Sequence, residues 1–256
     1  MSAVAAGRRV RVEHVMGTAV SLDLRDAEVP EDAVDAFFAW LRSVDARFST
    51  YRADSLVSRV RRGELALARA DADLREVLGM CEEARRTSHG TFDVWRHSRA
   101  GLDPSGLVKG WSIDRGAEIL EEGGGRNFCV NAGGDVLARG GAAPGSPWRI
   151  GIRHPLRADR TCAVVAGRGL AVATSGAYER GDHILDPATG QPPSGLLSVT
   201  IAGPRLAHAD AYATAAFAMG RDAPGWMATL PGYDGLAVTV ERQVVSTAGM
   251  ERLRLS

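Results

Sequence analysis

Lysine is almost absent from this chain: among its 31 lysine and arginine residues, only Lys109 is a lysine. Lysine carries a compact point charge, whereas arginine presents a planar fork. The single lysine stands in the run Asp103–Gly110, between two glycines, where a phosphate is the obvious partner for a small ammonium. Chance survival of one lysine on an exposed surface explains the composition equally well, so neighbouring motifs must decide.

Net charge and long apolar runs are also missing. The chain has 31 acidic and 31 basic side chains, so no overall field draws it to nucleic acid or to an anionic membrane, and an anionic ligand must be bound locally. No window approaches the roughly 18 apolar residues of a membrane-spanning helix, and residues 1–15 lack the apolar stretch of a signal peptide. We therefore expect a cytoplasmic protein with no nucleic-acid partner and no membrane insertion.

Cysteine is scarce as well. Cys81, Cys129 and Cys162 are an odd number, widely spaced, and each lies in an apolar run. This pattern predicts small buried side chains in a reducing compartment rather than a disulfide framework.

The 256 residues are 45% hydrophobic, enough for one large core, and no repeat or linker divides them. Helical spacing of apolar residues predicts helices from Pro30 to Phe48 and over Leu74–Cys81, Trp111–Glu122, Ala207–Met219 and Pro224–Leu230. Short β-rich segments bounded by turns predict strands over Val20–Leu24, Phe128–Val130, Trp148–Ile152, Cys162–Val165, Ala171–Ala173, Leu197–Ile201, Leu236–Val240 and Gln243–Thr247. We therefore predict a single α+β domain over residues 1–256, with a largely antiparallel sheet core and flanking helices.

Asp210 and Thr214 are four residues apart on a predicted helix, which places a carboxylate and a hydroxyl on one face, one turn apart. Two hard oxygen donors at this spacing suit Mg²⁺, which keeps several waters and binds substrate phosphates. An N-cap aspartate followed by an incidental threonine is the simpler alternative.

His183 precedes Ile184 and Leu185 and then the turn Asp186-Pro187. A histidine ordered by such a turn is suited to act as a general base, because its ordinary pKa lies near neutrality. A core histidine with satisfied hydrogen bonds is the alternative.

Eight short segments together resemble the FAD:protein FMN transferases of the ApbE family, in the same order along nearly the whole chain. Each segment alone is weak, whereas eight in sequence are a strong signal. They are Met16-Gly-Thr18, Phe48-Ser-Thr-Tyr51, Gly90-Thr-Phe-Asp93, Ser105-Gly-Leu-Val-Lys-Gly110, Val130-Asn-Ala-Gly-Gly-Asp135, Ala173-Thr-Ser-Gly176, His183-Ile-Leu-Asp-Pro-Ala-Thr-Gly190 and Ala209-Asp-Ala-Tyr-Ala-Thr214.

The resemblance implies an ApbE-like, T-fold-like domain that binds FAD and Mg²⁺ and moves FMN onto a threonine hydroxyl of an acceptor flavoprotein, releasing AMP. It implies His183 as the catalytic residue, and Asp210, Thr214 and the backbone carbonyl near Gly106 as metal ligands. The residues that it implies as FAD contacts are Met16, Tyr51, Thr91, Phe92, Asp93, Asp103, Lys109 and the backbone at Leu185.

Two departures from the family pattern stand out. Ser105-Gly106 replaces the usual pair of glycines, and the segment between Asp93 and Asp103 is short, which indicates a subgroup. Two alternatives to transfer remain open at this point. With water as the nucleophile, the same site would be a Mg²⁺-dependent FAD pyrophosphatase giving FMN and AMP. A non-catalytic flavin-binding protein would need neither the metal pair nor His183.

Overall fold

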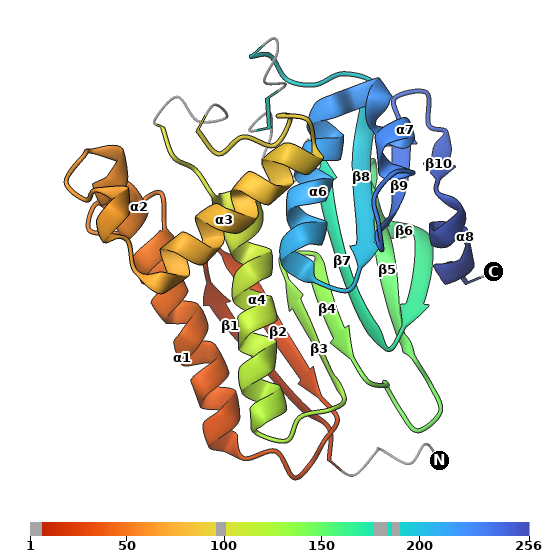
Figure 1. Cartoon of the computed structure of the whole chain (residues 1–256). Coiled ribbons are helices and arrows are strands. Elements are labelled where there is room, and N and C mark those ends of the chain that lie inside the picture. Colours follow the sequence, from red (N-terminus) through yellow and green to blue (C-terminus); the bar gives the residue numbers. More distant parts are fainter. Residues whose placement is uncertain (1–6, 96–100, 177–183, 186–189, 256) are drawn as a thin grey trace.

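An eight-stranded antiparallel sheet forms the centre of the computed structural model, which describes residues 7–95, 101–176, 184–185 and 190–255 (Figure 1). The neighbouring strands of this sheet are, in spatial order, β1 (Arg9–Val15), β2 (Thr18–Leu24), β3 (Phe128–Ala132), β4 (Asp135–Arg139), β7 (Gly169–Gly176), β8 (Leu196–Gly203), β9 (Asp234–Thr239) and β10 (Val244–Ser246). Every neighbouring pair is antiparallel, as the sequence predicted.

Helices cover one face of this sheet (Figure 1). The long ones are α1 (Glu31–Phe48), α3 (Ala72–Thr87), α4 (Ser105–Glu122) and α6 (Leu206–Met219). Shorter elements are α2 (Leu56–Arg61), α7 (Ala223–Met227), α8 (Ala248–Leu253) and the 3₁₀ turns η1 (Leu67–Arg69) and η2 (Gly220–Asp222). None of the helices in the described ranges is both long and apolar enough to cross a membrane.

The other face is covered only in part, by the hairpin of β5 (Trp148–His154) and β6 (Arg157–Gly167) and by α8, whose buried Met250 belongs to the same core (Figure 1). Alternate residues of the central strands therefore enter two cores. On β4, Leu137 packs in the core under the helices, while Val136 and Ala138 pack against Trp148 and Ile150 of the hairpin. The inner core is larger and holds the fully buried Trp111.

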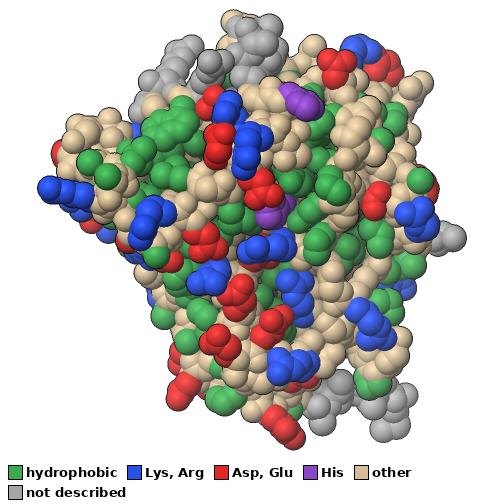
Figure 2. Space-filling model, viewed as in Figure 1, with side chains coloured by type: hydrophobic (Ala, Val, Ile, Leu, Met, Phe, Trp, Pro, Cys, Tyr) green, Lys and Arg blue, Asp and Glu red, His purple; other side chains and the backbone are tan. Residues whose placement is uncertain are grey.

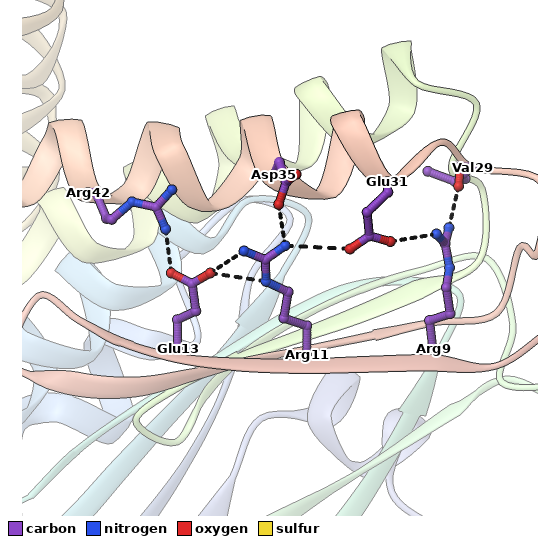
Figure 3. A network of polar contacts seen from close by, with 7 residues as sticks. All are labelled: Arg9, Arg11, Glu13, Val29, Glu31, Asp35 and Arg42. Carbon is purple, nitrogen blue, oxygen red and sulfur yellow. Dashed lines mark hydrogen bonds and ion pairs between the residues drawn. The ribbon is translucent and has the colours of Figure 1, made fainter.

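The edge strand β1 carries its charged residues toward α1 and its apolar ones outward. Arg11 lies 2.5 Å from both Glu13 and Asp35, Arg42 lies 2.5 Å from Glu13, and Arg9 pairs with Glu31 at 3.1 Å (Figure 3). Val10 and Val12, on the opposite face, are 54% and 55% exposed. The sequence analysis missed β1, although its alternation of arginine and valine over residues 9–12 is the pattern of a strand.

The predicted start of α4 was wrong. The helix begins at Ser105, six residues before the expected Trp111, so Lys109 lies on a helix and not in a loop. Gly106 and Gly110 suggested a loop, but both are places where α4 packs closely against α6. The strand β4 and the helices α2 and α8 were also missed, whereas the other predicted elements are present with bounds shifted by a few residues.

The prediction for the cysteines was right in one case of three. All three are free, but only Cys81 is buried, whereas Cys129 and Cys162 are half-buried. Burial raises the pKa of the Cys81 and Cys129 thiols to about 12.

Candidate functional site

The crossing of α4 and α6 sets the geometry of the site. A side chain at Gly110 would collide with the backbone carbonyl of Leu206, so glycine permits the close approach of the two helices. Below the crossing, the carboxylate of Asp114 accepts hydrogen bonds from the backbone N–H groups of Leu206 and Ala207, both at 2.9 Å. Burial raises the pKa of Asp114, although these two hydrogen bonds and Arg205 act in the opposite direction. A carboxylate of α4 thus caps the first turn of α6.

Lys109 lies between two buried carboxylates. Its Nζ is 2.5 Å from Oδ2 of Asp135, at the start of β4, and 3.9 Å from Oδ1 of Asp210 on α6. The second oxygen of Asp210 accepts a hydrogen bond from the Gly110 N–H at 3.3 Å, and that of Asp135 accepts one from the Thr174 N–H at 3.0 Å. The Lys109 side chain is 20% exposed, while the Asp135 and Asp210 side chains are 2% and 7% exposed. The lone lysine is therefore part of a buried charge cluster and not a surface residue.

Gly106, Thr214 and Phe92 meet one helical turn from this cluster. A Cβ atom at Gly106 would lie 3.2 Å from Oγ1 of Thr214 and 3.4 Å from the Phe92 ring. A Cβ contact of 3.2 Å is tighter than ordinary van der Waals contact, so glycine at position 106 lets α4 pack closely against Thr214 of α6. Asp210 lies in the second turn of α6, which begins at Leu206, so the alternative of an N-cap aspartate is wrong.

Asp93 and Asp103 lie close together near the start of α4. The Asp103 N–H donates to the Val94 carbonyl at 2.7 Å, which holds the two ends of the intervening segment together. The carboxylate of Asp93 accepts from the Trp95 N–H at 2.9 Å, and that of Asp103 accepts from the Ser105 N–H at 3.1 Å. Asp103 also lies 3.5 Å from Arg61 of α2. The N–H of Thr91 donates to the Ser88 carbonyl at 3.0 Å.

Met16 reaches the cluster from the turn between β1 and β2, where its φ is 55°. Its sulfur lies 3.4 Å from the hydroxyl of Ser112, and that hydroxyl donates to the Lys109 carbonyl at 2.7 Å. Tyr51, by contrast, is 94% exposed just beyond the end of α1. Leu185 is half-buried. The predicted base His183 lies outside the described residues.

The sequence analysis did not predict Asp135 as a site residue, although Asp135 ends one of the eight family segments. The signal was available: a carboxylate directly after two glycines opens a strand whose next residues are the apolar Val136, Leu137 and Ala138. A charge at the end of such a buried strand needs a partner, but the sequence does not say which of its 31 basic residues supplies it. No group of three or more His, Cys, Asp or Glu side chains in the described part of the chain is arranged to hold a metal ion. A magnesium site here therefore depends on the mixed donors Asp210, Thr214 and backbone.

Comparison of the sequence with models of known protein families shows to which family this chain belongs. The ApbE family model matches residues 16–98 and 94–237. The chain therefore belongs to the ApbE family.

Two curated relatives carry the name FAD:protein FMN transferase. The protein from Treponema pallidum is 33% identical over 174 residues, which cover 60% of this chain and 48% of the relative. The protein from Vibrio cholerae is 35% identical over 131 residues, which cover 47% of this chain and 39% of the relative. The chain thus spans less than half the length of either relative.

Solved structures share the fold along the whole chain. The ApbE protein from Thermotoga maritima superimposes with a TM-score of 0.87 at 23% identity, covering 97% of this chain and all of the other. The flavinyl transferase ApbE of Pseudomonas stutzeri gives a TM-score of 0.84 at 22% identity, with full coverage of both chains. These likenesses confirm the predicted fold class.

Proposed function

We propose that the protein catalyses Mg²⁺-dependent transfer of FMN from FAD to a threonine hydroxyl of an acceptor flavoprotein, with release of AMP. The observation that carries the proposal is the position of Lys109 between the buried Asp135 and Asp210. Two buried carboxylates and one ammonium, where two helices meet the start of β4, are more than a purely structural role requires, and they suit a ligand that brings phosphates and a cation. The names of the curated relatives support the same activity.

The donors at the α4–α6 crossing fit a magnesium ion. Asp210 offers a buried carboxylate, Thr214 a hydroxyl one turn later, and Gly106 a backbone carbonyl on the helix that packs closely against Thr214. We assign Asp210, Thr214 and the Gly106 carbonyl as the residues that would hold the ion. When bound, Mg²⁺ neutralises charge on the phosphate oxygens.

The chain's own residues then hold FAD in place and accept the proton of the acceptor hydroxyl. Lys109 places its ammonium on the pyrophosphate, while Met16, Tyr51, Thr91, Phe92, Asp93, Asp103 and the backbone of Leu185 hold the remainder of FAD. The acceptor hydroxyl attacks the FMN phosphorus, the bond from that phosphorus to the bridging oxygen breaks, and AMP leaves with that oxygen. In this proposal His183 takes the proton of the attacking hydroxyl.

The test is incubation with FAD, Mg²⁺ and candidate flavoproteins from the same source, followed by intact-mass measurement of each candidate. An adduct of FMN mass on a threonine supports the proposal. Free FMN and AMP without an adduct would make the protein a pyrophosphatase, and FAD that is bound but unchanged would make it a flavin-binding protein. The cytoplasmic location stays a prediction, to be checked by cell fractionation.

A further inference from the structure

A groove on the face opposite the helices is not used by the proposed reaction. Its volume is about 420 Å³, and it runs between the strand β5 and the outer face of β3, β4 and β7. Cys129 and Asn131 of β3 form one wall and residues 149–153 of β5 the other. The groove therefore lies along one side of a strand.

That side of β5 is unpaired. β5 pairs with β6, and the far side of β6 is met by the C-terminal segment through a bridge from Val165 to Arg254 and a hydrogen bond from the Leu255 N–H to the Val164 carbonyl at 2.8 Å. Within the described ranges, no strand pairs with the other side of β5. Over residues 149–152, no described strand takes up the outward backbone N–H and C=O groups, so an added strand can bond to them.

The open area beside β5 has room for such a strand. The central sheet is eight strands wide, but the outer layer holds only two, so the outer face of β1, β2 and β3 is left uncovered by described residues. Val12, Ser21 and Asn131 form one row across this face by register, and the exposed Val10 and Val12 lie at its far edge. A strand added to β5 would place alternate side chains over this surface.

The positive charge of the β5–β6 hairpin favours an acidic binding partner. Residues 148–168 contain five arginines, Arg149, Arg153, Arg157, Arg160 and Arg168, against one acidic residue, Asp159, although the chain as a whole is neutral. Arg149 and Arg153 are exposed and alternate along β5 with the buried Ile150 and Ile152. The guanidinium group of Arg149 therefore stands beside the outward side chains of an added strand, where a carboxylate pairs favourably. A second copy of β5 would set arginines against arginines, which disfavours self-association.

The groove also leads to the site. The Gly133–Gly134 turn lines it and is followed directly by Asp135, the partner of Lys109. Thr174 lines it too, and its N–H donates to the Asp135 carboxylate. A segment bound along β5 thus ends beside the turn that precedes the charge cluster.

We propose that β5 binds an extended acidic segment of the acceptor protein by strand addition, with acidic residues alternating with apolar ones beside Arg149 and Arg153. The inference rests on the proposed function for the identity of the partner. The shape of the groove and the free strand edge favour a polypeptide over a nucleic acid or a membrane, neither of which pairs with backbone N–H and C=O groups in this way.

The test uses a fluorescent peptide of seven residues, the length of β5, with alternating aspartate and valine and a central threonine. The same peptide with lysine for aspartate is the control. We expect the full chain to bind the acidic peptide and not the basic one. Arg149→Glu combined with Arg153→Glu should weaken binding about tenfold. Arg75→Glu combined with Arg115→Glu changes the net charge equally on the helix side and should leave binding unchanged.

Hydrogen exchange of the parent chain tests the strand addition separately from the charge. Peptide binding should slow exchange of backbone amides within Trp148–His154. Protection elsewhere, equal binding of both peptides, binding that survives the β5 charge reversals, or displacement by an equimolar single-stranded oligonucleotide would each overturn the proposal. Peptide binding without FMN transfer to any flavoprotein would overturn the proposed function alone. FMN transfer with no binding at β5 would overturn this inference alone.

Discussion

Lys109 is held by two carboxylates, at 2.5 Å from Asp135 and 3.9 Å from Asp210, and its side chain is 20% exposed. A guanidinium is wider than an ammonium and bonds as a planar fork, so it would not fit between these oxygens without moving one of them. We expect Lys109→Arg to slow FMN transfer by roughly tenfold or more although the charge is kept. The measurement is the initial rate of adduct formation by mass spectrometry. Full activity of the variant would mean that chance preserved this lysine.

Asp210 is the only charged residue among the assigned metal ligands. Asp210→Asn keeps the volume and an oxygen that can accept from the Gly110 N–H, but it removes the charge. We expect transfer to fall by at least about a hundredfold, because a metal ion is worth several kcal/mol to phosphoryl chemistry. Rates measured over a range of Mg²⁺ concentrations check the assignment, and the thermal midpoint of unfolding should stay near that of the parent. Unchanged dependence on Mg²⁺ would remove Asp210 from the metal site.

The thiols give a prediction that depends on pH. Burial raises the pKa of Cys81 and Cys129 to about 12, so both remain protonated in the folded protein at pH values where an exposed thiol begins to ionise. We expect both to react with iodoacetamide far more slowly at about pH 8 in the folded than in the unfolded protein. Peptide mapping after timed alkylation measures each site. Rapid labelling of Cys81 without denaturant would show that α3 opens locally.

At the scale of elements, the contact of α4 with α6 aligns the residues of the site. Gly110 meets the Leu206 backbone, and backbone cannot move aside as a flexible side chain can. We expect Gly110→Ala to destabilise the protein by about 1–3 kcal/mol. Gly79→Ala on α3 is the matched control: its added Cβ has no neighbour within 4 Å, so it should stabilise by about 0.5–1 kcal/mol. Urea denaturation measures both, and an unchanged stability of Gly110→Ala would show that the helices separate freely.

The same crossing shows why the sequence predicted some elements and not others. α1 and α3 were found because one side of each is apolar and buried while the other faces solvent. The first turns of α4 were missed because glycine at Gly106 and Gly110 is unfavourable in a helix, and only the neighbouring helix explains it. The pairing of Lys109 with Asp135 joins α4 to β4, and no local pattern reports such a distant contact. By contrast, the spacing of Asp210 and Thr214 is local, so their common helix was predicted correctly.

At the scale of the whole molecule, charge is balanced locally as well as in sum. Acidic and basic side chains are interspersed over the helical face (Figure 2). Arg47 pairs with Asp71 and Asp73, and Arg85 with Glu82. The β5–β6 hairpin departs from this balance, with five arginines against one aspartate over residues 148–168. This excess of arginine lies on the hairpin, which covers the face of the sheet away from the long helices.

The two cores share one sheet, and this predicts how the molecule unfolds. Leu137 enters the inner core and Val136 the outer one, so loss of either layer exposes one face of the same strands. We expect Ile150→Ala, in the outer layer, to cost about 2–5 kcal/mol and to shift the unfolding of the helices, although the helices lie on the opposite face. Ile113→Ala on α4 is the inner counterpart and should shift the same single transition. Far-ultraviolet circular dichroism in urea follows the helices. If Ile150→Ala does not change the urea midpoint of the helical signal, the hairpin unfolds by itself. Residues 1–256 would then not form one cooperative unit.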